Sequence, residues 1–475
     1  MIWKTAWKNV WRNKVRSLVV IISVTIGIFG GVFAVAVMNG ALEQRLDAAL
    51  NEELGHIQIT APGFRDNFDI RLTIPGAGNL SERIGQVPGV EAVATRTIIN
   101  GMANTASKST GVQITGIDPQ AEKEVLRLHE RTIPGTGEYL GEESRGPLAF
   151  IGEDLARELD IIRYIIDESM LKKLAGRGVP ATVLEKLEPW KDFRFKSEKD
   201  FRKEMQGVLN RHEEEAWGRI IREEAWTFRE RSRMTLTFLD RNLVQTGGMF
   251  RIAGIYDIRN NMFEMTRVFV DNRDLAALTG LSENEAHQLI IRTVETEQAS
   301  AISQELTARL PDLEVMSWKE IQPDLAMMTG MVQKFYAVFM IIILAALAFG
   351  IVNTMLMVVL ERTKELGMLT AIGMNKKRVF SMIMLESIFL SLVGGVTGMV
   401  VSRLLILFTG NQGINFAGYQ EGFEAMGFSA HIYPEISPGF FVTVTILIIL
   451  TGILSSVYPA LKALRLDPAE ALRTE

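Results

Sequence analysis

The sequence contains no cysteine, which excludes disulfides and thiol chemistry. Its five histidines are scattered without the spacing of a zinc site, so we expect no metal site. The phosphate-binding pattern G-x-x-x-x-G-K-[S/T] is absent as well, so we expect this chain to bind no nucleotide or other cofactor and to carry no catalytic residues. A net charge of -5 gives no indication of a nucleic-acid partner.

What the sequence does contain is a set of long apolar segments. Hydrophobic residues make up 47% of the chain although 23% of it is charged, so the two kinds must be segregated along the sequence. Crossing a bilayer takes about 20 mostly apolar residues. The first such segment resembles a cleaved signal peptide at Ala34-Val35-Ala36, but its apolar stretch is longer than a usual signal core and continues as helix. The predicted spans are 18–38, 335–360, 379–403 and 440–461.

The distribution of Lys and Arg beside these spans predicts their orientation, because cytoplasmic loops carry an excess of both. Basic residues are frequent in 1–17, 361–378 and 462–475, whereas 404–461 contains none. We therefore expect a multi-pass protein of the bacterial inner membrane with both termini and the loop 361–378 in the cytoplasm. The connecting segments on the extracytoplasmic side are then 39–334 and 404–439.

The long segment 39–334 has the pattern of a mixed domain. Apolar residues at helical spacing continue outward from the first span and return through 317–334, which predicts two helical stalks. Between the stalks, runs such as 56–60 alternate as strands do, and 297–310 has a helical pattern. The sequence thus predicts four transmembrane α-helices with a large α+β extracytoplasmic domain inserted between the first and the second.

Within this domain, the segment from about 162 to 233 differs in character. It is dense in charges of both signs, and its apolar residues recur at helical intervals. We interpret it as a helical insertion in which Trp190, Trp217 and Trp226 are packing anchors. Its exposed surface is either a solvated covering of the domain or a docking surface for a partner or substrate.

The N-terminal segment carries an aromatic and a basic stripe, each at four-residue spacing. Side by side, such stripes describe an amphipathic helix in the headgroup layer, where Trp rings are favoured and cations pair with anionic lipids. Steering of the first span, or contact with an ATPase, is the alternative role. The predicted membrane-interface anchors are Trp3, Trp7, Trp11, Lys4, Lys8 and Arg12.

Polar and small residues inside the spans are few. Glu386 lies inside the third span, where an acid is costly and is usually paired or functional, so either a structural hydrogen bond or a proton relay would account for it. The pairs Gly27/Gly31 and Gly394/Gly398 suit close helix contacts, either within the chain or in a dimer.

The loop between the second and third spans has the pattern of a short amphipathic helix over 361–373. Leu366, Leu369 and Ile372 form its apolar stripe, and Gly373 suits its C-terminal end. A helix this short is marginal alone in water, so the membrane surface, the adjacent spans or a groove on another protein should hold it.

Several motifs in this chain occur together in one known family. Residues 361–373 read E-R-T-K-E-L-G-M-L-T-A-I-G, the third span contains L-E-S at 385–387 followed by glycines, and 458–472 begin with Y-P-A and end with P-A-E-A-L. The opening 6–17 and the segment 151–156 fit the same family. Together these motifs resemble the FtsX/MacB-like permeases of ABC transporters, most closely the lipoprotein-releasing (Lol-type) permeases.

The resemblance implies a non-catalytic permease subunit. In this family the loop helix is a coupling helix that sits in a groove on an ATPase subunit, and ATP-driven closure of two such subunits moves the permease helices. The stalks carry the motion outward, and substrate is handled at the outer face of the membrane without passing through a channel. The residues that match the coupling element are Glu361, Arg362, Lys364, Glu365, Leu366, Leu369, Ile372 and Gly373.

The implied partners are two separate ATPase subunits that bind the ATP and Mg²⁺, a second permease copy or paralogue, membrane lipids, and a periplasmic chaperone or adaptor. MacB differs in having its ATPase fused to the permease, FtsX has a much smaller outer domain, and the insertion departs from the plain lipoprotein-releasing pattern. The expected function is extraction of a lipoprotein or another amphiphile from the outer leaflet of the inner membrane. MacB-like tripartite efflux and an FtsX-like mechanical scaffold acting on an extracytoplasmic enzyme are the alternatives.

Overall fold

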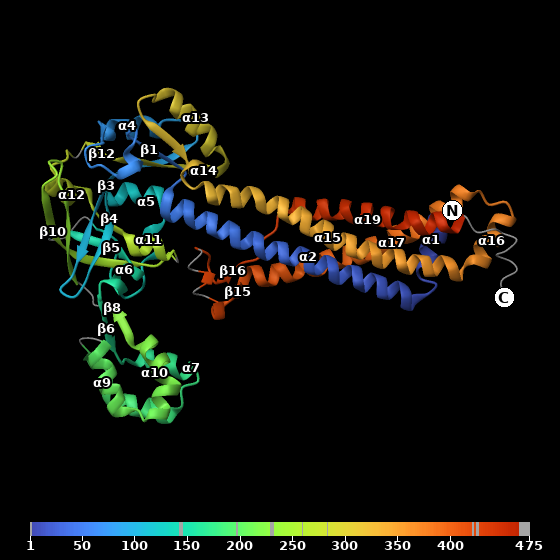
Figure 1. Ribbon diagram of the computed structural model, residues 1–475, viewed down its shortest axis with the longest axis horizontal. Helices are drawn as coiled ribbons and strands as arrows, with labels where there is room; N and C mark the ends of the chain where they lie inside the picture. Colours follow the sequence, from blue (N-terminus) through green and yellow to red (C-terminus); the bar gives the residue numbers. More distant parts are fainter. Residues whose placement is uncertain are drawn as a thin grey trace. The chain divides into compact units, whose positions relative to one another are not determined.

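The computed structural model divides the chain into two compact units (Figure 1). The membrane unit comprises Met1–Arg45, Asp324–Phe423 and Phe428–Glu475, and the inserted domain comprises Leu46–Pro323 with Glu424–Gly427. The residues that the structure describes are 2–141, 146–195, 198–228, 232–258, 260–282, 284–419, 422–423 and 427–464.

Four described helices are long and apolar enough to cross a membrane, and each contains one of the predicted spans. They are α2 (Lys14–Ala48), α15 (Pro323–Glu361), α17 (Lys376–Gln412) and α19 (Pro438–Leu464). Proline is tolerated as the first residue of α15 because the first helical N–H groups have no partner within the helix. The shorter elements of this unit are α1 (Ile2–Val10), α16 (Thr363–Ala371), β15 (Ile414–Asn415), the 3₁₀-helix η5 (Ala417–Tyr419) and β16 (His431–Ile432).

The N-terminal helix is shorter than the predicted segment 1–17. It ends at Val10, and after a turn α2 begins at Lys14, so the end of the predicted segment already belongs to the first long helix. The Ser17 side chain closes this turn by donating a hydrogen bond to the Val10 carbonyl. A side-chain contact of this kind leaves no trace in the helical periodicity, which is why the sequence did not show the break.

The four-residue spacing of glycines in the spans serves contacts within the chain. A Cβ on Gly27 would meet a side chain of α15 at 3.0 Å, and a Cβ on Gly394 would meet α2 at 2.8 Å. Gly31 and Gly398 face α15 and α2 in the same way. Packing inside one chain is therefore the alternative that the structure supports for both pairs.

The segment before α19 lies across α2 at a glycine. The Glu435 N–H donates to the Ala36 carbonyl at 3.0 Å, and the Tyr433 N–H donates to Gln44 Oε1 at 3.2 Å. A Cβ on Gly40 would lie 2.0 Å from the Tyr433 carbonyl oxygen, so a larger residue would push this segment away. The backbone of the loop thus binds directly to the first long helix.

Among the described residues, the inserted domain is built on a nine-stranded sheet in the order β14-β1-β13-β3-β4-β11-β5-β10-β9. An additional pairing of β3 with β9 closes β3, β4, β11, β5, β10 and β9 into a ring, so none of these six has a free edge. The strands are β1 (Ile57–Thr60), β3 (Val90–Asn104), β4 (Ser109–Ile117), β5 (Leu148–Gly152), β9 (Arg233–Leu239), β10 (Gln245–Tyr256), β11 (Arg267–Asp271), β13 (Gln288–Thr293) and β14 (Glu314–Ser317).

Alternation along a strand of the ring is clearest in β9. In β9, Met234, Leu236 and Phe238 are buried while the threonines between them are more exposed, as expected when one face of a sheet is apolar. The remaining elements are α3 (Phe64–Asn67), β2 (Ile74–Pro75), α4 (Ala77–Gly85), α5 (Pro119–Val125), η2 (Leu128–Arg131), α6 (Glu153–Glu158), α11 (Asn261–Thr266), α12 (Asn272–Thr279), β12 (Glu285–Ala286), η4 (Thr296–Gln298), α13 (Ala299–Arg309) and α14 (Trp318–Ile321). The predicted fold class, four membrane helices and an inserted α+β domain, is confirmed.

The predicted first stalk changes its helical type before the sheet begins. After Ala48 the chain forms a π-helix, η1 (Ala49–Leu54), which ends at Gly55 with φ 68°. Arg131 Nε donates to Glu52 Oε1 of this π-helix at 2.6 Å, and so ties it to η2. Such π-helical turns are rare and frequently mark functional positions in helices.

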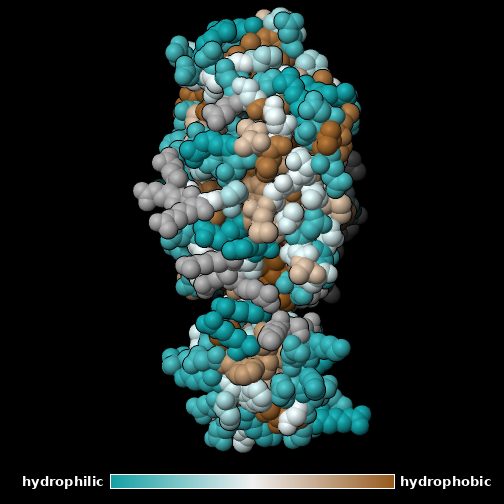
Figure 2. Space-filling model, turned by 90° about the vertical axis from the view of Figure 1, so that its left-hand side faces the viewer, coloured by the Kyte–Doolittle hydropathy of each residue, from teal (hydrophilic) through white to brown (hydrophobic). Residues whose placement is uncertain are grey.

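The segment 162–233 is only partly the helical insertion that its pattern predicts. Its helices surround a three-stranded sheet, β7-β6-β8, and Trp190, Trp217 and Trp226 pack against a separate apolar core as expected. The strands were missed because they are very short and β8 directly follows a helix. Figure 2 shows this lobe, at the bottom of the view, as mainly hydrophilic. Its elements are β6 (Ile162–Ile165), α7 (Glu168–Gly176), α8 (Ala181–Leu187), η3 (Glu188–Trp190), β7 (Arg194–Phe195), α9 (Glu198–Val208), α10 (Arg211–Ala225) and β8 (Trp226–Phe228).

One carboxyl group of the inserted domain, that of Glu264, is buried. Glu264 of α11 accepts a hydrogen bond from the Ile258 N–H at 2.8 Å. Burial, together with the negative charge of Asp257, raises the pKa of Glu264 to about 8. Because its ordinary pKa is near 4.5, the folded domain holds a proton that the unfolded chain releases between these two values.

We expect this group to make the domain less stable as the pH rises. A raised folded-state pKa of an acid contributes stability that is present at low pH and is lost between about pH 4.5 and 8. The loss reaches at most about 1.4 kcal/mol per pH unit. In Glu264→Gln, which keeps the acceptor for Ile258, denaturant unfolding followed by fluorescence should show a flatter dependence on pH over this range. An unchanged slope in the variant would assign the pH dependence to other groups.

Candidate coupling site at the α16 end of the membrane helices

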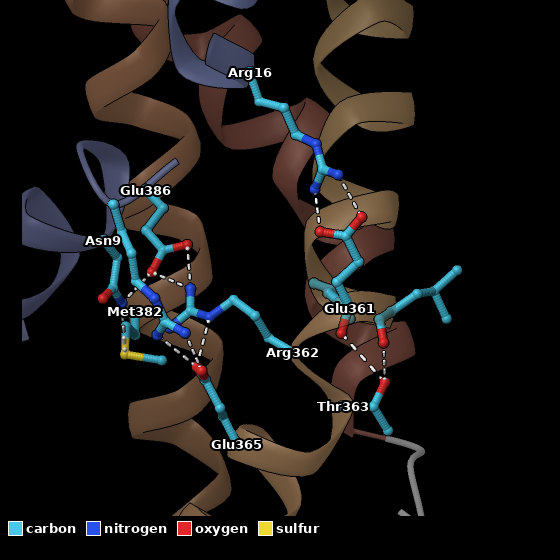
Figure 3. Close-up of polar contacts among 11 residues, drawn as sticks. Asn9, Arg16, Glu361, Arg362, Thr363, Glu365, Met382 and Glu386 are labelled. Carbon is cyan, nitrogen blue, oxygen red and sulfur yellow. Dashed lines mark hydrogen bonds and ion pairs between the residues drawn. The ribbon is translucent and has the colours of Figure 1, made fainter. Parts of the chain in front are cut away.

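The polar residues of the predicted coupling loop form ion pairs within the chain (Figure 3). Arg362, between α15 and α16, donates from Nη1 to both carboxylate oxygens of Glu386 in α17, at 3.2 and 3.3 Å. Its Nε also donates to Glu365 of α16 at 3.1 Å. Asn9 of α1 completes the arrangement by donating to Glu386 Oε1 at 2.6 Å. One guanidinium and one carboxylate thereby connect four helices.

Two further arginines extend this cluster at the surface. Arg12, in the turn before α2, pairs with Glu365, and Arg16 in the first turn of α2 pairs with Glu361 at the end of α15. Both contacts are bidentate, with each guanidinium donating through two nitrogens. Arg12 and Arg16 therefore attach the start of the chain to the end of α15, at Glu361, and to the first turn of α16, at Glu365.

The inner and outer ion pairs differ in burial, and this decides their energetic weight. The Glu386 side chain is 5% exposed and that of Arg362 is 17% exposed, whereas Arg12 and Glu361 are 57% and 45% exposed. Exposed pairs contribute about 0–1 kcal/mol each. Removing one partner of a buried pair costs about 3–5 kcal/mol because a charge is left without compensation. The Arg362–Glu386 contact is thus the one that the local structure depends on.

The outer pairs remain charged throughout the physiological pH range. The hydrogen bond from Arg12, supported by Arg362, lowers the pKa of Glu365 to about 2. Its contribution to stability is therefore complete above pH 4.5 and is lost only as the pH falls toward 2. These two outer pairs therefore do not respond to pH changes near neutrality.

The helix α16 presents a different apolar side than the sequence predicts. Leu366 is only 4% exposed and belongs to the core of the membrane unit, and Leu369 is partly buried against the same core. The residues that face outward are Met368 of α16 and Ile372 of the turn directly after it, which are 51% and 79% exposed. Leu366 is therefore wrong as a partner-facing residue, because the stripe at 366 and 369 is the side that packs on the adjacent helices.

The end of α16 follows the predicted pattern. Gly373 has φ 98°, a conformation that favours glycine, and the Met374 N–H donates to the Leu369 carbonyl at 3.0 Å. This is the bond of a Schellman ending, which closes the helix and turns the chain toward α17. Lys364, the remaining residue of the predicted element, is exposed.

The predicted membrane anchors divide into two groups. Trp3 and Trp7 place their rings edge-on against Phe389 of α17 at 5.8 and 5.5 Å, so part of the aromatic stripe packs on a neighbouring helix. Trp11 contacts Trp7 and, like both other tryptophans, stays exposed. The predicted lipid-facing cations Lys4 and Lys8 are exposed too. Arg12, assigned to the lipid surface in the sequence, is instead paired with Glu365.

Sequence reasoning missed Asn9 and Arg16 as members of the cluster. A signal was present, since Arg12 and Arg16 are four residues apart and so are Glu361 and Glu365. Two arginines and two glutamates with the same spacing can pair when their helical segments lie side by side. The sequence alone does not show this, because the two segments are far apart in the chain. For Glu386, the contacts with Asn9 and Arg362 support the structural hydrogen bond over the proton relay.

Known proteins are similar to both parts of the chain. The model of the FtsX-like permease C-terminal family matches residues 337–468, and that of the MacB-like periplasmic core domain matches residues 17–183. The chain belongs to the FtsX/MacB-like permeases of ABC transporters. Along the chain, the match to the periplasmic core domain precedes the match to the permease C-terminal family. In the same way, the inserted domain precedes most of α15 and all of α16, α17 and α19.

Relatives at the sequence level agree with this assignment. The permease is 28% identical over 232 residues to an uncharacterized ABC transporter permease of Methanocaldococcus jannaschii, covering 48% of this chain and 55% of the relative. It is 27% identical over 233 residues to the macrolide export ATP-binding/permease protein MacB of Escherichia coli K12, covering 47% of this chain and 34% of MacB. The matched region is thus only part of either relative's length.

Two solved extracytoplasmic regions are also similar. The extracellular domain of the transporter YknZ from Gram-positive bacteria is 11% identical and covers 55% of this chain and 99% of that domain. The periplasmic region of MacB from Actinobacillus actinomycetemcomitans is 12% identical and covers 57% of this chain and 94% of that region. Both TM-scores are 0.28, which is too low to establish a common fold.

The two family matches and the four long apolar helices show that the permease is a membrane protein with an extracytoplasmic inserted domain.

We expect the buried ion pair to dominate the stability of the membrane unit. Arg362→Met leaves Glu386 buried without a cation, and the midpoint of thermal unfolding of the purified permease in detergent should fall well below that of Arg16→Met, which removes only an exposed pair. The double variant Arg362→Met/Glu386→Met should regain much of the loss, because two apolar side chains replace two charges. Equal midpoints for Arg362→Met and Arg16→Met would contradict this ranking.

Proposed function

We propose that this permease transmits motion from a nucleotide-binding partner, through α16, to the extracytoplasmic domain. ATP and Mg²⁺ are bound by that partner, two copies of which act on a pair of permease chains. Both termini and the loop that contains α16 lie in the cytoplasm of a bacterium, and the inserted domain lies outside the inner membrane. The work done there is the extraction of an amphiphile, such as a lipoprotein, from the outer leaflet.

The arrangement of α16 is the observation that supports this proposal. Its inner side is held by the buried Leu366 and by Glu365, which is bonded to Arg12 and Arg362. Its outer side exposes Met368 and Ile372, which an aqueous compartment would not favour without a partner. A helix fixed on one side to several spans and apolar on the other suits the transfer of force from a second protein to the bundle.

The interior of the spans supports action at the membrane surface. Apart from Glu386 and the Tyr336 hydroxyl, the buried polar side-chain groups described in the four spans are serine hydroxyls, and most of these bond to carbonyls of their own helix. The hydroxyl groups of Ser387 and Tyr336 have no partner among the described atoms. A single chain thus offers no continuous polar lining for a hydrophilic substrate in its described residues. The permease would move its substrate by motion of the extracytoplasmic domain.

Export of a small amphiphile is the second candidate. It rests on similarity to MacB and to the pyoverdine export ATP-binding/permease protein PvdT of Pseudomonas entomophila, which is 35% identical over 126 residues, or 26% of this chain and 16% of PvdT. Both names state export of a small molecule. In either case the same coupling helix would be used, and the insertion at 162–228 is the part available for a periplasmic chaperone or adaptor.

The outward side of α16 gives a direct test. An apolar side chain that is buried in a groove contributes about 1.5–3 kcal/mol, and about 1.4 kcal/mol is a factor of ten in affinity. Ile372→Asp and Met368→Asp should each weaken binding of the co-purifying ABC ATPase at least about tenfold and reduce its ATP hydrolysis in the complex. Ile372→Val should bind nearly as the unmutated chain does.

Leu366→Ala serves as the matched variant on the inner side of the same helix. It should lower the thermal stability of the permease itself, since Leu366 is in the core. If Ile372→Asp and Met368→Asp bind and stimulate the ATPase like the unmutated chain, α16 is a linker and the energy enters elsewhere, with α1 as the next candidate.

The proposed orientation is tested by topology reporters. Fusions after Met38 and within 410–438 should report the extracytoplasmic side, whereas fusions at Asn375 and after Glu475 should report the cytoplasm. The physical reason is the excess of basic residues at the α16 end and their absence from 404–461. A cytoplasmic signal from the inserted domain would contradict both the orientation and the coupling role of α16.

A further inference from the structure

An apolar groove runs along the outside of α17 and α19, away from the α16 end. It encloses about 480 Å³ and is open along one side. Two turns of each helix line it at three- and four-residue spacing, so its walls follow the helix axes. The lining residues are Val396, Met399, Val400 and Arg403 of α17, and Pro438, Phe441, Val442 and Thr445 of α19.

Arg403 is the charged residue of this groove. It is exposed, and it makes no hydrogen bond, ion pair or cation–π contact with any residue that the structure describes. From Leu404 to Leu461 the sequence contains no other Lys or Arg, while it contains Glu421, Glu424 and Glu435. The groove therefore presents one isolated positive charge in a region whose other charges are acidic.

The apolar surface of α17 does not end at this arginine. Leu404, Leu407 and Phe408 follow it and are exposed, so Arg403 lies within the apolar band of the helix and not beyond its end. An unpaired guanidinium at such a depth is costly, and long cationic side chains reduce the cost by extending toward the lipid headgroups. A guanidinium at this position is stabilised most when two of its N–H groups donate hydrogen bonds to one phosphate group.

We propose that this groove binds an anionic phospholipid whose phosphate pairs with Arg403 and whose acyl chain lies along the two helices. The apolar walls suit the chain, since each buried CH₂ group contributes about 0.8 kcal/mol. A phosphate is the feature that separates this ligand from the acyl chains of a lipoprotein, so the site is distinct from the handling of the proposed substrate. In the proposed orientation the lipid comes from the outer leaflet.

The charge part of the site is tested by native mass spectrometry of the full-length permease. The unmutated chain, purified in a detergent that retains lipids, is titrated with phosphatidylglycerol and separately with phosphatidylcholine of the same acyl chains. One cation near a membrane surface contributes about 1 kcal/mol, which corresponds to about a fivefold change in affinity. Arg403→Gln should therefore bind phosphatidylglycerol about fivefold more weakly. The loss for phosphatidylcholine should be smaller, because its choline cation already offsets the charge of the phosphate that Arg403 contacts.

The groove itself is tested by filling it while Arg403 is retained. Val442→Trp places an indole in the groove and should weaken phosphatidylglycerol binding, whereas Ile446→Trp, an exposed residue of α19 outside the lining, should not. Equal phosphatidylglycerol affinity in Arg403→Gln and the unmutated chain would overturn the proposal. So would unchanged binding in Val442→Trp, or a dimer of permease chains that Val442→Trp separates without any change in lipid binding. Because no ATPase is present in these measurements, their outcome does not depend on the coupling role of α16.

Discussion

The buried contact between Arg362 and Glu386 is the interaction on which the α16 end of the membrane unit depends. Neither charge can be left alone at this depth, so the position of one fixes the position of the other. Arg362 stands where α15 passes into α16, Glu386 belongs to α17, and Asn9 brings α1 to the same carboxylate. A displacement of α16 must therefore displace α15 and α17 with it or break this contact. Leu366 packs in the apolar core beside this contact, so moving α16 away from its neighbours would also open a gap in that core.

The first long helix is linked to this cluster at one end and to other backbone groups at its far end. Arg16 attaches its first turn to the end of α15, and Ala36 accepts the Glu435 N–H from the segment before α19. Beyond Ala48 the same helix continues as η1, whose Glu52 is bonded to Arg131 of the inserted domain. In the proposed coupling, motion at the α16 end would therefore enter the inserted domain along this one continuous stretch of chain. The six strands of the closed ring in that domain have no free edge at which another chain could pair.

The elements with a strong period could be predicted from the sequence, and contacts between distant segments could not. The long helices follow from apolar length, and strands such as β4 and β10 follow from alternation, because both properties are local. The ring closure by β3 and β9 depends on a pairing between residues 101–104 and 235–238, for which no local pattern exists. The same limit explains the candidate site. The sequence motif identified the residues of the loop helix, but it did not show which of them face the spans and which face outward. Leu366 and Ile372 belong to the same apolar stripe in the sequence, and only the positions of the neighbouring helices show that Leu366 is buried and Ile372 exposed.

The pairing of charges inside the chain restricts how a partner can recognise α16. Glu361, Arg362 and Glu365 are each bonded to residues of the permease, so a partner that bonded to them would have to compete with existing bidentate contacts. The exposed Met368 and Ile372 have no such competition, and methionine adapts readily to an uneven surface. Affinity for a partner at this helix must then come mainly from apolar burial, which is nondirectional, whereas the geometry of the helix comes from the ion pairs behind it. In the proposed role, firm attachment to the spans would come from the inner side of α16, and adhesion to a moving partner would come from Met368 and from Ile372 in the turn directly after the helix.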